Sequence, residues 1–215
     1  KRDNRMTNTL MAPGRKYWNN NASHTTWTDA DKAAFDNKDF YPTSGSGYNN
    51  QKWATERNVK DEYEGYDFPI IRYAEVLLNY AEATFKYFGS ADIKDAELTM
   101  TAREAVNKVR KRTGVDMPDF PEGMSSSDFW SRYKNERMVE LAFEGHRFWD
   151  VRRWEEGQTY FNQPIHGMRI TMENEKASYE TFVVEERVFE PKMNYYPIPQ
   201  SELQKNSKLD QNPGW

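Results

Sequence analysis

The sequence predicts a mainly α-helical protein built from helix pairs of the tetratricopeptide kind, with long loops and a small β-hairpin. Three observations support this fold class. Apolar residues recur at helical spacing over residues 67–112, charged and aromatic residues do so over 136–154, and β-forming residues gather nearer the C-terminus. We therefore divide the chain into a loop-rich segment (1–66), a helical scaffold (67–156), and a β-hairpin with an extended tail packed on the scaffold (157–215).

Composition excludes several classes of protein. The net charge of the 215 residues is only −4, which gives no reason to expect nucleic acid or an anionic membrane as a partner. Cysteine is absent, so thiol catalysis and zinc–thiolate sites are excluded. No run approaches the roughly 18 apolar residues of a membrane span. The sequence opens at Lys1 in polar residues without a visible signal peptide, so we expect a processed or truncated chain.

Aromatic residues are unusually frequent and many fall in the loop-rich segment. Phe, Trp and Tyr make up 15% of the chain. A flat ring can stack on the apolar C–H face of a sugar while neighbouring polar groups bind its hydroxyls. Our candidate glycan-binding residues are Trp18, Trp27, Tyr48 and Trp53. The alternative is that these rings only anchor loops to the helical body.

Two helices are predicted in the first part of the scaffold. Residues 67–88 carry two adjacent apolar stripes, with Asp67 as N-cap and Pro69 in the first turn. Residues 91–112 form the second helix, and Gly114 follows as a C-cap signal. The short connection between them implies an antiparallel hairpin, in which Ala102 and Ala105 allow the bulkier first helix to pack closely.

The rest of the chain is predicted in shorter elements. A third helix starts at residues 125–128 and ends near Gly145, and a fourth covers 146–155. Two strands, 168–172 and 181–189, bracket an irregular loop over 173–178. Residues 195–199 are extended because two of them precede proline, residues 201–205 form one helical turn, and Trp215 docks on the helical body.

The stretch 136–154 carries the most concentrated charge. On a helix, Arg137, Glu140, Glu144 and Arg147 fall in one row beside apolar positions, which predicts a structural salt-bridge network. The sharper alternative is a glycosidase that uses Glu140 and Glu144, since i, i+4 side chains lie about 5–6 Å apart and retaining enzymes hold their carboxyls about 5–5.5 Å apart. A metal site with His146 is weaker, because it has no second histidine. Adjacent arginines lower a carboxyl pKa, which is wrong for a general acid.

Three stretches together resemble a known family. DFPIIRYAEVLLNYAEA (67–83), ERMVELAFEGHRFWDVRRW (136–154) and YYPIPQSELQKNSKLDQNPGW (195–215) resemble, in this order, the C-terminal half of the SusD/RagB family. That resemblance implies a SusD-like α/α superhelix. It also implies a glycan-binding lipoprotein on the outward face of the outer membrane in Bacteroidetes, which is not an enzyme and needs no catalytic cofactor.

The resemblance further implies a partner. Family members sit on a SusC-like TonB-dependent transporter and deliver oligosaccharide to it; their membrane attachment is a lipid anchor on an N-terminal cysteine that this sequence lacks. Members are longer than this sequence, so we expect a C-terminal fragment or truncated chain. Glycan contacts in the family come from variable loops and cannot be transferred by motif. An interaction module that binds the transporter alone is the remaining alternative.

Overall fold

The computed structural model describes residues 3–10, 50, 52–53, 69–173 and 176–215. These residues fall into two compact units that divide between Glu144 and Gly145. The described part is mainly helical with one two-stranded antiparallel sheet, so the predicted fold class is confirmed. Among the helices of these residues, none combines the length and apolar character needed to span a membrane.

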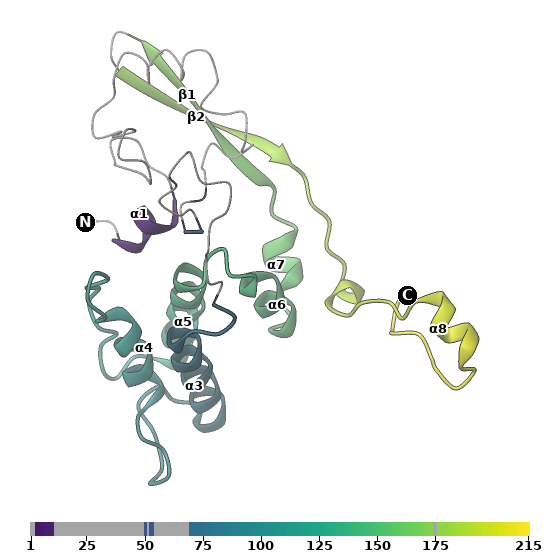
Figure 1. The fold of residues 1–215 in the computed structure, drawn as a ribbon, viewed down its shortest axis with the longest axis horizontal. Coiled ribbons are helices and arrows are strands. Elements are labelled where there is room, and N and C mark those ends of the chain that lie inside the picture. Colours follow the sequence, from purple (N-terminus) through teal and green to yellow (C-terminus); the bar gives the residue numbers. More distant parts are fainter. Residues whose placement is uncertain (1–2, 11–49, 51, 54–68, 174–175) are drawn as a thin grey trace, which may run out of the picture. The chain divides into compact units, whose positions relative to one another are not determined.

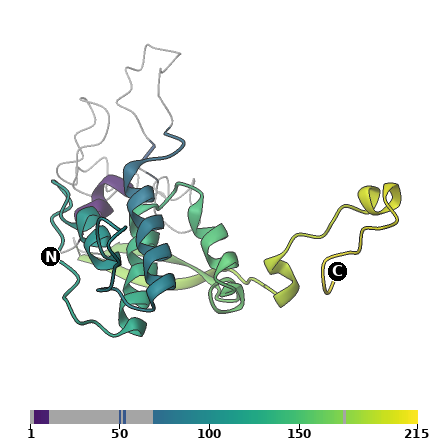
Figure 2. The ribbon, with the colours of Figure 1, turned by 90° about the horizontal axis from the view of Figure 1, so that it is seen from below.

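In the part that the structure describes, the first unit contains three packed helices and a short N-terminal helix. These are α1 (Arg5–Thr9), α3 (Tyr73–Phe88), α4 (Ala102–Arg110) and α5 (Ser126–Glu140). Helices α3, α4 and α5 lie side by side (Figure 1), and the second view shows the same grouping (Figure 2). This arrangement is the helix-pair packing that the apolar stripes predict.

The core of the first unit is filled from all three long helices. Helices α3 and α4 pack against each other, and Leu78 and Ala81 of α3 and Ala105 and Val106 of α4 are all fully buried. The small alanines on α4 leave room for the larger side chains of α3. From α5, the buried Tyr133 donates its hydroxyl to Leu78 O at 3.0 Å, so even the polar tip of this ring is satisfied inside the core.

Two helices begin later than predicted. Arg72, not Asp67, immediately precedes α3. Its backbone is extended (φ −128°, ψ 156°), and its side chain donates to Glu140 and Glu144. Helix α4 begins after Thr101, which forms a capping box with Glu104, rather than near residue 91. In the intervening segment Asp95 Oδ1 accepts hydrogen bonds from following backbone amides, which holds a turn in place of a helix.

The second unit begins at Gly145, which has a φ of 80°. A Cβ there would meet no atom within 4 Å, so the left-handed backbone, not close packing, requires glycine. Helix α6 (His146–Arg153) follows, then α7 (Gly157–Phe161). Further along the chain lie the 3₁₀ helix η1 (Pro191–Asn194) and α8 (Gln200–Lys205).

The hairpin is longer and tighter than predicted. Strand β1 (Ile165–Glu173) pairs with β2 (Lys176–Glu185), and Met168 lies opposite Thr181. The predicted irregular loop over 173–178 is therefore wrong, since 173 and 176–178 are paired in the ladder, while residues 186–189 lie beyond the strand. In the same unit, Trp215 donates from Nε1 to the carbonyl oxygens of Lys192 at 3.0 Å and Tyr195 at 3.1 Å, so the C-terminus docks on the η1 segment.

Candidate functional site

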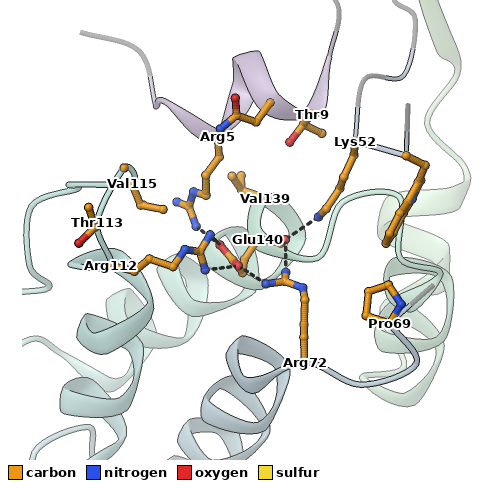
Figure 3. A pocket seen from close by; sticks show the side chains of 13 residues that line it. Arg5, Thr9, Lys52, Pro69, Arg72, Arg112, Thr113, Val115, Val139 and Glu140 are labelled. Carbon is orange, nitrogen blue, oxygen red and sulfur yellow. Dashed lines mark hydrogen bonds and ion pairs between the residues drawn. The ribbon is translucent and has the colours of Figure 1, made fainter. Parts of the chain in front are cut away.

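Three arginines from distant parts of the sequence converge on one carboxylate of the first unit. Glu140 is the last residue of α5, and its side chain is only 1% exposed. Arg5 donates to its Oε2 at 2.9 Å, and Arg72 and Arg112 each donate to its Oε1 at 2.6 Å (Figure 3). Arg5 belongs to α1, Arg72 precedes α3 and Arg112 follows α4, so Glu140 joins the ends of three segments.

A second carboxylate, one helical turn earlier, extends the network. Glu136 accepts a hydrogen bond from Arg5 Nη1 at 2.5 Å and another from Arg110. Arg5 also pairs with Asp3 at 2.6 Å. Burial opposes the charge on Arg5, but hydrogen bonds to Asp3 and Glu136 outweigh it and raise its pKa. The short helix α1 is thereby attached to α5 through one buried cation.

Side chains also satisfy the backbone at the end of α5. The last carbonyl groups of a helix have no partner within it, and cations are favourable there. Lys52 donates from Nζ to the carbonyl oxygens of Glu140 and Ala142, at 3.0 Å each. Trp53 donates from Nε1 to Phe143 O at 2.6 Å. Phe143 has a φ of 60°, so these contacts hold a backbone turn that its side chain disfavours.

The two carboxyls of the predicted row have lowered pKa values. Glu144 accepts from Arg72 Nε at 2.7 Å and pairs with Lys52. Burial raises the pKa of both Glu140 and Glu144, but hydrogen bonds outweigh it: Arg112 and Arg72 lower the pKa of Glu140, and Arg72 and Lys52 lower that of Glu144. Both groups are ionised at neutral pH.

A cavity of about 400 Å³ opens beside this network, within the first unit (Figure 3). Its walls include the Trp53 side chain with Pro69, and the guanidinium of Arg112 beside Thr113. The cavity therefore combines an aromatic and aliphatic surface with hydrogen-bonding groups. Its volume lies within the roughly 300–1,000 Å³ of small-molecule sites.

A second, larger hollow of about 620 Å³ lies along α4. Lys108 and Lys111 line it, and Arg112 and Thr113 border both hollows. Lys111 pairs with Asp119 at 2.6 Å, whereas Lys108 is exposed. The two hollows thus share Arg112 and Thr113, and the second is lined by cations together with the carboxylates of Glu104 and Asp119.

Of the four predicted glycan-binding residues, the structure places one. Trp53 is partly buried, lines the 400 Å³ cavity, and has its indole N–H committed to Phe143 O. Trp18, Trp27 and Tyr48 lie outside the described residues. They remain predictions from sequence chemistry.

The four residues of the predicted salt-bridge row, Arg137, Glu140, Glu144 and Arg147, contact different partners in the structure. Arg137 donates to Asn79 Oδ1 at 2.8 Å, and Arg147, in the second unit, lies 4.4 Å from the ring centre of Tyr160. Glu140 and Glu144 are instead paired with cations that sequence reasoning missed: Arg5, Lys52, Arg72 and Arg112. These partners lie between 28 and 135 residues from Glu140 along the chain, so no local spacing could have revealed them.

The geometry argues against Glu140 and Glu144 as a catalytic pair. Their side chains are 1% and 8% exposed, so a glycosidic bond has no room between them. A glycosidase needs one carboxylic acid with a raised pKa, whereas both pKa values here are lowered. Within the part of the chain that the structure describes, no group of three His, Asp or Glu side chains could hold a metal.

The packed helix pairs, braced by buried ion pairs and carrying an open polar cavity, define a helical scaffold of the kind that presents a ligand site. The chain matches the family model of the SusD family over residues 1–215, and it belongs to that family. Among curated proteins, none matches this chain.

Solved structures of SusD-like proteins resemble the chain. A SusD-like protein from Bacteroides fragilis is 32% identical over 80% of the chain and 31% of its own length, with a TM-score of 0.62. A SusD-like carbohydrate-binding protein from the same species is 28% identical over 97% of the chain and 42% of its own, with a TM-score of 0.69. A SusD homologue from Bacteroides thetaiotaomicron is 25% identical over 99% of the chain and 41% of its own length, with a TM-score of 0.57. The chain thus spans less than half the length of these relatives.

Proposed function

We propose that this chain binds an oligosaccharide without catalysing a reaction on it. The observation that carries the proposal is the 400 Å³ cavity, which both Trp53 and Arg112 line on a scaffold of the SusD family. Membership of that family and the similarity to a SusD-like carbohydrate-binding protein support the choice of ligand.

The cavity has the chemical features that a sugar needs. An indole offers an apolar face on which the C–H face of a pyranose can stack, and burial of aromatic surface is a large source of affinity. Thr9 and Thr113 line the same cavity and offer hydroxyl groups for hydrogen bonds to ring hydroxyls. Because Trp53 is tied to Phe143 O, its ring is held in place and loses little entropy on binding.

We extend the proposal to location and partner on the basis of family membership. The protein acts at the outer face of the outer membrane, where it passes glycan to a SusC-like TonB-dependent transporter. Trp18, Trp27 and Tyr48 contribute further stacking surface in this proposal.

Isothermal titration against a panel of plant and host oligosaccharides, with affinity electrophoresis on the polymers, tests the proposal. Trp53→Ala is expected to weaken binding at least about fivefold, since truncating an anchoring aromatic costs more than about 1 kcal/mol. Trp18→Ala, Trp27→Ala and Tyr48→Ala are measured alongside. Trp215→Ala is the matched control, because this indole is also partly exposed but docks on η1.

The outcomes separate the alternatives. Binding that is unchanged in all four variants would reject these residues as the site. Absence of binding to any glycan, together with retained binding to the transporter, would favour a pure interaction module. Release of shortened sugar that is abolished by Glu140→Gln would favour a glycosidase.

A further inference from the structure

The ion-pair network beside the cavity has more cations than carboxylates. Among the described residues, it joins the cations Arg5, Lys52, Arg72, Arg110 and Arg112 to the carboxylates Asp3, Glu136, Glu140 and Glu144. Five positive charges therefore face four negative ones. Glu140 alone is shared by three guanidinium groups. Counted over the residues that the structure describes, the network thus has one positive charge in excess, beside a cavity.

That charge is most available at Arg112. Lys52 donates to three oxygens and so uses all three of its N–H groups, while Arg72 uses three of its five and has a side chain only 26% exposed. Arg112 directs both of its hydrogen bonds to Glu140 and is 41% exposed, the most of these cations that line the cavity. A guanidinium has five N–H groups, so Arg112 retains donors for a ligand.

The position of Arg112 links the two hollows. It and Thr113 border the 400 Å³ cavity on one side and the 620 Å³ hollow along α4 on the other. In the second hollow, Lys108 is exposed and makes no ion pair among the described residues. The two hollows therefore meet at Arg112. Two carboxylates also line the second hollow, but Asp119 is paired with Lys111 and Glu104 accepts a hydrogen bond from the backbone of Thr101, which leaves the charge of Lys108 available.

We propose that these two hollows bind successive units of an acidic oligosaccharide, with a carboxylate or sulfate group of the sugar on Arg112. The inference rests on the proposed glycan binding and specifies its substrate class. Planar guanidinium groups bind carboxylate and sulfate oxygens through paired charge-assisted hydrogen bonds. The unit beside Trp53 stacks on the ring, and the next acidic unit lies near Lys108.

The test compares three probes on the whole 215-residue chain by isothermal titration at low and high salt. The probes are an oligogalacturonate, its methyl ester and a sulfated galactan oligosaccharide. The carboxylate or sulfate probe is expected to bind about tenfold or more tighter than the neutral ester, and the preference is expected to shrink in high salt. The two acidic probes tell a carboxylate ligand from a sulfate ligand.

Variants test whether the effect lies in these two hollows. Arg112→Gln is expected to remove most of the acidic preference, a loss of about tenfold. Lys108→Gln is expected to weaken binding only of oligosaccharides that are long enough to reach the second hollow. This variant should fold normally because the side chain of Lys108 is exposed. Arg153→Gln, on a side chain 43% exposed in the second unit, is the matched control and leaves binding unchanged.

Two results would overturn the inference. The first is equal affinity for acidic and neutral probes. The second is binding of the acidic probes that neither Arg112→Gln nor Lys108→Gln alters. That result would mean that cations elsewhere on the protein attract the acidic groups. In both cases glycan binding itself survives, whereas a chain that binds no glycan of either kind removes the proposed function as well.

Discussion

Glu140 shows how a buried charge is made tolerable at a single residue. An isolated carboxylate away from water is strongly unfavourable, and its cost is recovered only when close cations and hydrogen bonds replace the lost solvent. Glu140 accepts four hydrogen bonds from three arginines, and its pKa is lowered in spite of burial. The carboxylate of Glu140 therefore has a structural role. Without it, three guanidinium groups would lie close together with no anion between them.

The first prediction is that stability depends on pH through this residue. A lowered pKa means that the folded protein binds fewer protons than the unfolded chain in acid, so the free energy of unfolding rises with pH there. The stabilisation that Glu140 contributes is fully present at pH values above the ordinary pKa of 4.5. It is lost as the pH falls through the lowered pKa of the folded state. At neutral pH, Glu140→Gln is expected to lower the free energy of unfolding by about 3 kcal/mol. The difference in stability between this variant and the natural chain should become smaller at acidic pH.

Urea denaturation from pH 3 to pH 7 measures this narrowing. Glu122→Gln is the matched control, because Glu122 is 82% exposed and its one ion pair, to Arg103, is at 4.0 Å. A gap between Glu140→Gln and the natural chain that stayed constant over the whole range would contradict the prediction.

At the scale of elements, close packing fixes where short helices can lie. Helix α7 has five residues, which is too few for a stable isolated helix, so its contacts must hold it. Gly157 begins α7, and a Cβ built there would lie 2.1 Å from Phe189 Cε1. Asn162, just after the helix, exchanges hydrogen bonds with the backbone of Phe189 at 2.5 and 3.2 Å. The chain after β2 is thereby tied to α7.

The second prediction concerns this contact. Gly157→Ala is expected to destabilise the protein by about 1–3 kcal/mol, because the added methyl group forces the Phe189 ring or the helix to move. Thermal denaturation followed by circular dichroism measures it. Gln158→Ala, at an exposed position of the same helix, should change stability by less than about 0.5 kcal/mol. Equal stability of the two variants would show that α7 moves without cost.

At the scale of the whole molecule, contacts between residues far apart in sequence decide how the first unit holds together. Arg5 lies 131 residues from Glu136 and 135 from Glu140 along the chain. Helix α1 has only five residues, and the described contacts that attach it to α5 centre on this one buried side chain. Its order therefore depends on ion pairs with a distant helix.

The third prediction is that Arg5→Gln releases α1 while α3 keeps its structure. The reason is that the variant leaves Asp3, Glu136 and Glu140 without their shared cation. Hydrogen exchange followed by mass spectrometry should show faster exchange at Leu10, whose amide donates to Met6 O at 2.8 Å. Exchange within α3 should change much less. Asn8→Ala, an exposed change in α1, should leave the pattern as it was. Unaltered protection of Leu10 in Arg5→Gln would mean that other contacts hold α1.

Local patterns carried enough information to find most of the elements. The helix over residues 73–88, the start of α5 after Ser125 and a break between helices at Gly145 are readable because helix periodicity, N-caps and glycine breaks depend on neighbouring residues. The predicted starts of the helices were less accurate than the helices themselves. Asp67 and Pro69 look like a helix start, but Arg72 is extended so that its side chain can reach Glu140 and Glu144.

Short-range patterns and long motifs are enough to predict the helical scaffold, the presence of a hairpin and the resemblance to the SusD family. The cations that neutralise Glu140 and Glu144, and the cavity that Trp53 and Arg112 both line, could be found only in the folded chain. These groups come from segments separated by tens of residues. Their meeting depends on how α1, α3, α4 and α5 pack, and no spacing within one segment records it.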